Sequence, residues 1–395
     1  MSEQSIRPFV LRHSISNWPA ANWTPDSVSR MLGSKLVAVR FGPRTQQRGK
    51  VSWESFTPSL EVTIAQLLNW YNGLEEPSIP FSRKEFWCYL DYKYMFDLLE
   101  TEHLKSVDWT DFLGVQRDGT DSTFWMGVEG AYTPCHYDTY GFNLHVQIYG
   151  HKRWILFPPE ESSKLVPTRI PYEQTTVFSS LDVASCPIDL CETSPYMVTL
   201  APGDLLYVPP KWWHFVQCLD LCMSANTWVP IAEDETKYRF PEALTRALVS
   251  VFVNRGLLTD DSLTPGEREL ALTLGDSIDW LNQLRPKGES RSSCPPVKQP
   301  KQQHDLQQFF LEKFGQKGSA VPRVTYEELK QQLSDGPISF TEGEPGSSSK
   351  ELGVSDLMEA LLHPEVVHKL QQSSTIIGCR VICCAKFMAF RPQSA

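Results

Sequence analysis

The feature that most constrains this chain is a pair of metal-binding residue types two positions apart, followed further along by a third. His136 and Asp138 lie in the segment TPCHYDTYGFNLHVQIYGHKRW, and His214 ends the segment PGDLLYVPPKWWH. Side chains two positions apart on an extended strand leave the same face. A partner strand can bring the third residue to them. The pattern predicts a metal site with the ligands His136, Asp138 and His214.

The ligand types indicate which metal chemistry to expect. Two histidines and one carboxylate on one face of a metal form the facial triad of non-haem Fe(II) oxygenases, which leaves coordination positions open for an oxoacid and oxygen. The far carboxylate of such an oxoacid needs a cation and hydroxyl donors, which Lys152 and Thr133 are placed to supply. A His-x-Asp pair alone occurs by chance in many proteins. The prediction therefore depends on Lys152 in the following strand and on the tryptophans before His214.

The segments around the predicted ligands have the alternation of strands. Within NLHVQIYG, Asn143, His145 and Gln147 fall on one face and three aliphatic residues fall on the other. A polar face of this kind can line the interior of a barrel. Lys152 and Trp154 share a face in the next strand. The region from 84 to 232 is therefore predicted to be a mainly β core.

The aromatic stretch KEFWCYLDYKYM allows two interpretations. As a strand, it places Trp87, Tyr89 and Asp91 on one face, and as a helix it places Tyr89 with Phe86 and Lys93. Aromatic runs more often form core than site. A buried tyrosine hydroxyl nevertheless needs a hydrogen-bond partner, which keeps Tyr89 as a candidate for the site.

The remaining chain divides by its periodicity. Residues 1–83 are predicted to form strands and helices that pack on the core, and residues 285–395 a linker-rich, partly disordered tail with short helices, best formed at 355–371. Residues 233–284 have helical periodicity and are expected either to pack on the core or to form a dimer seam. The expected apolar faces are Leu244, Ala247, Leu248, Val251 and Phe252, then Leu270, Leu274, Ile278 and Leu281, and in the tail Leu357, Leu361, Val367 and Leu370.

Composition excludes several classes of protein. The formal charge of −10 and the pI near 5.5 argue against a general nucleic-acid binder, which needs a basic face. The ten cysteines are scattered without zinc-type spacing, so reduced and mostly buried thiols are expected. Nothing resembles a signal peptide or a membrane span. A cytoplasmic protein is expected, with the nucleus as the alternative.

Four motifs together resemble the JmjC group of 2-oxoglutarate- and Fe(II)-dependent oxygenases within the cupin superfamily, above all its hydroxylase-type members. They are GVEGAYTPCHYD, the strand from Gln147 to Trp154 that leads into FPP, PGDLLYVPPKWWH, and SANTW. The resemblance covers about residues 8–250. It implies a double-stranded β-helix, or jelly-roll, core with flanking helices.

The resemblance also implies roles for individual residues. It assigns iron to His136, Asp138 and His214, and the distal carboxylate of 2-oxoglutarate to Thr133 and Lys152. Tyr89, Asn143 and Asn226 become neighbours of that co-substrate. His145 departs from the pattern, because the hydroxylases have an apolar or aromatic pocket residue there.

The segments KEFWCYLDYKYM, TPCHYDTYGFNL and PTRIPYEQTTVF further resemble heat-shock-associated members of the family. This likeness implies a small heat-shock protein as a partner and a link to the stress response. Two functions follow as alternatives. The chain is either an oxygenase that hydroxylates a protein side chain or a non-catalytic protein that uses the same scaffold to bind and modulate a small heat-shock protein. Related hydroxylases dimerise through similar C-terminal helices, so a homodimer is also expected.

Overall fold

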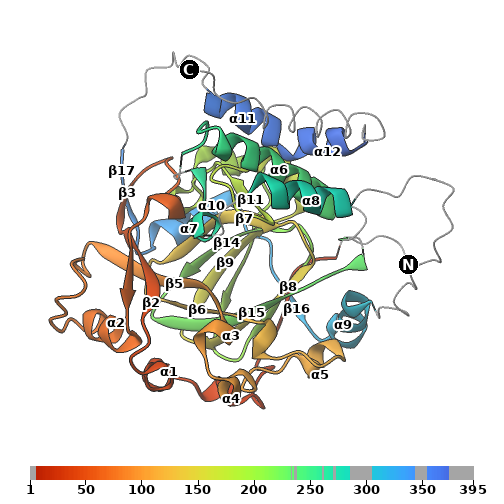
Figure 1. The fold of residues 1–395 in the computed structure, drawn as a ribbon. Helices are drawn as coiled ribbons and strands as arrows, with labels where there is room; N and C mark the ends of the chain where they lie inside the picture. The colour runs from red at the N-terminus through yellow and green to blue at the C-terminus, as the bar shows by residue number, and fades with distance from the viewer. Residues whose placement is uncertain are drawn as a thin grey trace. The chain divides into compact units, whose positions relative to one another are not determined.

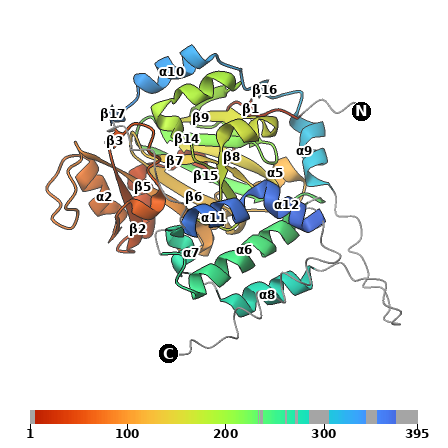
Figure 2. The same ribbon diagram turned by 90° about the horizontal axis from the view of Figure 1, so that it is seen from above.

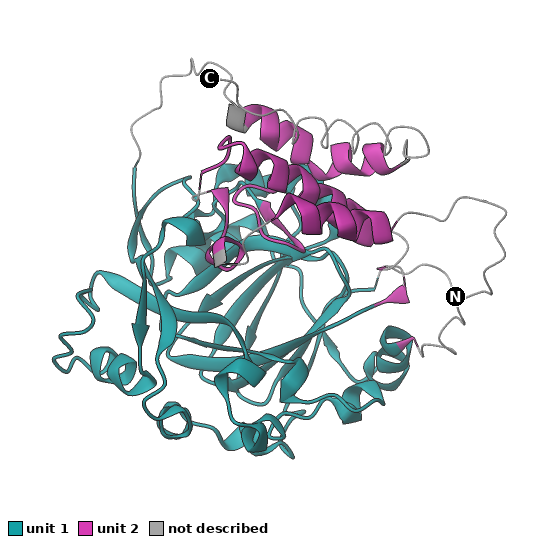
Figure 3. Cartoon of the chain, viewed as in Figure 1, with its two compact units in different colours: residues 1–166, 179–230, 306–346 teal, residues 167–178, 231–305, 347–395 magenta. Residues whose placement is uncertain are grey.

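The computed structural model describes residues 6–232, 234, 238–259, 262–269, 273–284, 305–342 and 354–372. The chain forms two compact units (Figure 3). Unit 1 comprises residues 1–166, 179–230 and 306–346, and unit 2 comprises residues 167–178, 231–305 and 347–395. In the described part of the chain no helix has the length and apolar character that a membrane crossing requires.

A nine-stranded sheet, in which every neighbouring pair is antiparallel, forms the larger part of unit 1. Hydrogen-bonded neighbours follow the order β16 (Ser319–Ala320), β1 (Phe9–Leu11), β13 (Leu205–Val208), β8 (Phe142–Tyr149), β15 (Cys222–Val229), β6 (Thr123–Gly127), β5 (Phe86–Tyr94), β2 (Val37–Pro43) and β4 (Ser59–Val62). Strands distant in sequence thus lie side by side, as Figure 1 shows for β8 and β15.

A second antiparallel sheet completes the core of unit 1. Its unit 1 strands follow the order β7 (Tyr132–Asp138), β14 (Trp213–Cys218), β9 (Lys152–Phe157) and β12 (Tyr196–Leu200). Figure 2 shows β9, β14 and β7 next to the strands of the nine-stranded sheet. The chain alternates between the two sheets from β6 to β9 and again from β12 to β15, and side chains from both sheets meet in one interior. The predicted mainly β core with flanking helices is confirmed.

The described helices of unit 1 are α1 (Pro25–Leu32), α2 (Ile64–Tyr71), α3 (Met95–Leu98), α4 (Thr101–Leu104), α5 (Thr110–Leu113), α9 (Leu306–Phe314) and α10 (Tyr326–Ser334). Three of them, α1, α2 and α10, begin at a threonine whose side chain caps the helix. For α2, the Thr63 side chain accepts a hydrogen bond from the Gln66 backbone while the Gln66 side chain accepts one from the Thr63 backbone. This capping box satisfies backbone N–H groups that the first helical turn leaves without partners.

Residues 306–342, which the sequence assigned to a linker-rich tail, are part of unit 1. Strand β16 extends the nine-stranded sheet beside β1, and β17 (Ser339–Thr341) pairs in parallel with β3 (Thr45–Gln47). Phe310 of α9 is fully buried, with its ring 5.8 Å from Phe9 and 5.4 Å from Tyr207 between centroids. Pairing with distant strands thus orders a segment whose own composition is weakly hydrophobic.

Unit 2 is mainly helical (Figure 3). It contains β10 (Pro167–Thr168), β11 (Thr176–Ser179), α6 (Arg239–Asn254), α7 (Pro265–Glu269), α8 (Leu274–Gln283), α11 (Val354–Leu362) and α12 (Pro364–Gln372). The face predicted for α6 packs inward, since Leu244, Ala247 and Val251 are buried. Leu281 of α8 packs in the same cluster, whereas the predicted Leu270 lies outside the described residues. Dimerisation through these helices stays a prediction.

One helical prediction is wrong in its register. The segment 355–371 is not one helix, because Pro364 starts a separate helix, α12, directly after α11. In α11 the buried side chains are Met358 and Leu362, whereas the predicted Leu357 and Leu361 are 61% and 37% exposed. Proline lacks the N–H that a continuing helix needs, so the chain starts a new helix there. Beyond it the predicted Val367 is buried and Leu370 packs against the same cluster, so the predicted stripe is wrong only in α11.

Candidate metal centre

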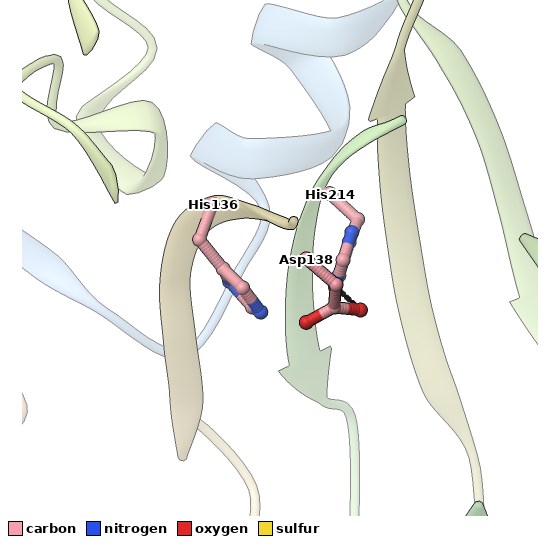
Figure 4. A group of neighbouring side chains, drawn as sticks. All are labelled: His136, Asp138 and His214. Atoms are coloured by element: carbon pink, nitrogen blue, oxygen red, sulfur yellow. Dashed lines mark ion pairs between the residues drawn. The ribbon is translucent and has the colours of Figure 1, made fainter. Parts of the chain in front are cut away.

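The three predicted ligands meet inside unit 1. Strands β7 and β14 are neighbours, and their register places His214 directly opposite His136. Asp138 ends β7 on the same side. One ligand atom from each of the three residues lies within 4.8 Å of the others, and their side chains point toward one another (Figure 4). Across the described residues, this is the one cluster of His, Cys, Asp and Glu with the spacing of a metal site.

Backbone carbonyls fix the orientation of both imidazoles. His136 Nδ1 lies 2.8 Å from the Pro134 carbonyl oxygen, and His214 Nδ1 lies 2.9 Å from that of Trp212. A carbonyl only accepts, so in each ring Nδ1 carries the proton and donates it. The lone pair is then on Nε2, on the far side of the ring, which is the state a metal-binding histidine needs. Each histidine is oriented by the residue two positions before it.

The carboxylate is held between an indole and an imidazole. Asp138 Oδ2 accepts a 2.9 Å hydrogen bond from Trp228 Nε1 and lies 3.9 Å from His214 Nε2. Burial raises the pKa of Asp138, and the nearby His214 together with hydrogen bonds from Trp228 and Asn143 partly offsets that effect. Burial, followed by the proximity of His214, lowers the pKa of His136 well below its ordinary value. His136 is therefore neutral at neutral pH, with its lone pair available to a metal.

The triad opens into a cavity between the two sheets. It encloses about 360 Å³, including its opening to solvent. Both sheets contribute side chains, and seven of the eight predicted site residues are among them, the exception being Asp138. The lining residues are Tyr89, Tyr92, Trp125, Thr133, His136, Asn143, His145, Lys152, Trp154, His214, Val216, Asn226 and Trp228.

Lys152 brings a fully buried positive charge to this cavity. Its Nζ donates a 3.0 Å hydrogen bond to the Tyr89 hydroxyl, and it lies 5.2 Å and 5.5 Å from the ring centroids of Tyr89 and Trp125. Thr133 is hydrogen-bonded to the same hydroxyl. No carboxylate within the described residues lies close enough to form an ion pair with Lys152. A buried cation without a counter-charge is costly, so this end of the cavity favours an anion.

The two predicted asparagines are joined to each other. Asn226 Nδ2 donates to Asn143 Oδ1 at 3.1 Å, and Trp125 Nε1 donates to Asn226 Oδ1 at 2.7 Å. The chain of hydrogen bonds crosses from β6 through β15 to β8. It fixes both amide orientations in the cavity wall, where the sequence predicted neighbours of an oxoacid.

The strand interpretation of the aromatic stretch is confirmed, since β5 spans Phe86–Tyr94. A register shift between Leu90 and Lys93 and a positive φ of 55° at Tyr92 mark a bulge in this strand. Tyr89 and Tyr92 therefore both line the cavity, although strict alternation would send them to opposite faces. Sequence carries no signal for such a bulge.

Other cavity residues had a usable signal. Trp154 and Val216 lie two positions beyond Lys152 and His214, and Trp228 lies two beyond Asn226, so strand alternation places each on an inward face. His145 is 3% exposed and lines the cavity, with its ring 4.7 Å from Trp154 between centroids. The polar residue that departed from the family pattern therefore lies in the site itself.

Comparison with known proteins agrees with this architecture. The family model for the cupin-like domain matches residues 3–232. The chain belongs to this family. The match covers the described strands of both large sheets except β16. The cupin-like domain thus includes the triad and the whole cavity.

Among similar proteins, the HSPB1-associated protein 1 homolog of Danio rerio is 32% identical over 95% of this chain and 94% of its own length. HSPB1-associated protein 1 of Bos taurus is 39% identical over 62% of this chain and 52% of its own length, so the chain spans about half of that relative. Lysine-specific demethylase 8 of Xenopus tropicalis is 26% identical over 56% of this chain and 48% of its own length. A Jumonji C domain-containing protein 5 of Drosophila melanogaster is also 26% identical.

Proposed function

We propose that the unit 1 cavity binds Fe(II) and 2-oxoglutarate, and that the protein is an oxygenase that hydroxylates a protein side chain. One observation carries the proposal. A histidine–aspartate–histidine group shares a single cavity with a fully buried lysine that has no ion-pair partner among the described residues. Relatives named for Jumonji C domains and for a lysine-specific demethylase support it.

The residues fit the two groups in type and in charge. Two neutral imidazoles and a carboxylate suit Fe(II). Asp138 and a dicarboxylate carry three negative charges, which Lys152 and a dication balance, so the filled cavity is neutral. Neutrality matters because the charged groups are removed from water, where an unbalanced charge is costly. Without the metal, burial opposes ionisation of Asp138, and a cation beside it would reverse that effect.

Each side chain has a separate task in this proposal. Lys152 binds the distal carboxylate, with Thr133 and Tyr89 as hydroxyl neighbours. Asn143 and Asn226 hold the wall between that carboxylate and the triad. Bound iron would supply the oxygen chemistry, in which 2-oxoglutarate, O₂ and a C–H bond yield succinate, CO₂ and an alcohol. The surrounding aromatic rings limit the access of water to the cavity.

Succinate release tests the proposal. Fe(II)-loaded protein is incubated with 2-oxoglutarate in air, and the wild type is compared with His136→Ala and Asp138→Ala. We expect succinate from the wild type and little from either variant, because each loses a metal ligand. His151→Ala is the matched control, since His151 lies at the exposed turn before β9 and should leave turnover unchanged. Wild-type succinate no higher than that of the two ligand variants refutes the oxygenase.

A second function is favoured by the names of the relatives. HSPB1-associated protein 1 is named for its association with HSPB1, and the 39% identity of the bovine protein suggests that this chain binds a small heat-shock protein. In this version the domain is a binding scaffold and catalysis is absent. Purified HSPB1 is titrated against the wild type and Asp138→Ala. Equal affinity together with no succinate supports the scaffold, and no binding to either protein refutes it.

A further inference from the structure

Two polar atoms in the cavity wall have no hydrogen-bond partner among the residues that the structure describes. They are His145 Nε2 and Trp154 Nε1, both buried, on side chains that are only 3% and 2% exposed. Both residues line the cavity. Buried polar groups almost always have partners, and an exception at a cavity points to a ligand that supplies the missing one.

The two side chains come from different sheets and meet across the cavity. His145 belongs to β8 and Trp154 to β9, and their rings pack edge to face with centroids 4.7 Å apart. The other side of the Trp154 indole stacks on His214, with 5.6 Å between centroids. Lys152 lies two positions before Trp154 and therefore on the same face of β9. The pair thus lies next to both the triad and the buried cation.

The chemistry of these atoms indicates what they bind. An indole N–H can only donate, and a lysine ammonium offers three donors. Lys152 uses one of its donors for the Tyr89 hydroxyl. This part of the cavity therefore has donors in excess. A carboxylate has two oxygens with about four acceptor positions and matches such a set, whereas a methyl group matches none of it.

We propose that Trp154 Nε1 and the Nε2–H tautomer of His145 donate to the distal carboxylate of the bound oxoacid together with Lys152, and so select a dicarboxylate over a monocarboxylate. The inference rests on the proposed function for the oxoacid itself. It adds two specificity-determining residues to the predicted Thr133 and Lys152.

Calorimetric titration with two matched oxoacids tests this selection. Protein loaded with Mn(II), which prevents turnover, is titrated with 2-oxoglutarate and with 2-oxopentanoate, which has a methyl group in place of the distal carboxylate. In Trp154→Phe and His145→Phe we expect the affinity for 2-oxoglutarate to fall about tenfold, because each variant removes one charge-assisted hydrogen bond. The affinity for 2-oxopentanoate should stay the same. His145→Gln keeps an N–H donor and should recover part of the loss.

A second measurement separates selection from a purely structural role. Removing a buried polar atom that has no partner should leave the stability of the ligand-free protein unchanged or raised. We therefore expect His145→Phe to unfold on heating at or above the wild-type temperature, and Trp154→Phe to lose no more stability than Trp18→Phe, which removes the same ring volume from another buried site. Trp18→Phe is the matched control, since Trp18 is 3% exposed and lies outside the cavity lining, and it should bind both oxoacids as the wild type does.

Three results overturn the inference. They are unchanged 2-oxoglutarate affinity in both variants, an equal loss for the two oxoacids, and an unfolding temperature of both variants that falls further than that of Trp18→Phe. A wild type that takes up Mn(II) but binds neither oxoacid refutes the oxoacid part of the proposed function instead. The two failures are therefore distinguishable in one series of titrations.

Discussion

Replacing Lys152 by methionine should separate ligand binding from folding. The lysine is fully buried, and it contacts one hydroxyl and two aromatic rings without forming an ion pair. Methionine has a similar length and no charge, so it keeps most of the packing. In the proposed function this lysine binds the distal carboxylate of 2-oxoglutarate. Its loss should therefore weaken that ligand while leaving the fold intact.

The magnitudes follow from the contacts. A hydrogen bond to a charged group contributes about 1.5–3 kcal/mol, so 2-oxoglutarate should bind roughly 10- to 150-fold more weakly. In the ligand-free protein, the substitution loses the bond to Tyr89 and two cation–π contacts of about 0.5–2 kcal/mol each. It also removes a desolvation cost of several kcal/mol for the buried ammonium. These terms nearly cancel, and the free energy of unfolding should change by less than about 2 kcal/mol.

Two measurements on the same preparation check this prediction. Urea unfolding gives the stability of the ligand-free variant, and calorimetry with Mn(II) present gives its affinity for 2-oxoglutarate. Tyr89→Phe is the matched control, because it keeps the ring and the lysine charge and should weaken 2-oxoglutarate by roughly tenfold or less. If Lys152→Met binds 2-oxoglutarate as tightly as the wild type and loses more than about 2 kcal/mol of stability, the lysine is structural and the reasoning fails.

Three further substitutions test the packing and charges of the two units. Gly42→Ala should lower the free energy of unfolding by about 1–3 kcal/mol, because the added methyl group would overlap the buried Trp87 indole. An unchanged urea midpoint would contradict this. Arg169→Met should cost about 3–5 kcal/mol, because it leaves Glu242 buried without the two 2.8 Å hydrogen bonds from Arg169. The double variant Arg169→Met with Glu242→Leu should recover most of that loss, and a double variant that recovers none would show that the pair acts through other contacts. Burial raises the pKa of Asp182 from 3.8 to about 6. Between these two pH values the folded state keeps the Asp182 proton and the unfolded state loses it, so the free energy of unfolding should fall as the pH rises through that interval. Asp182→Asn should remove the fall, and parallel stability curves for the two proteins would rule out this cause.

Much of the site followed from strand alternation in the sequence. His136 and Asp138 share a face because they are two apart, and the same rule extends from Lys152 to Trp154 and from Asn226 to Trp228. Alternation is local and needs no knowledge of the partner strand. It therefore finds which side chains face inward, although not which of them meet.

The rest depended on long-range structure. Tyr92 enters the cavity through a bulge whose register is set by β6, and no local pattern marks it. Residues 306–342 contain only short helices, and their strands β16 and β17 pair with β1 and β3, strands near the start of the chain. In unit 2, Pro364 interrupts the helix that was expected at 355–371, and in α11 the buried side chains lie one position after the predicted ones.

The central claim is that one cavity binds both a metal and a 2-oxoacid. Equilibrium dialysis with Mn(II) and labelled 2-oxoglutarate tests it most directly, because it requires neither turnover nor a known substrate. The wild type should bind one metal and one oxoacid per chain. Asp138→Ala should lose both, and Lys152→Met should keep the metal and lose the oxoacid. Metal binding that is the same in Asp138→Ala as in the wild type, or oxoacid binding that needs no metal, would contradict the account.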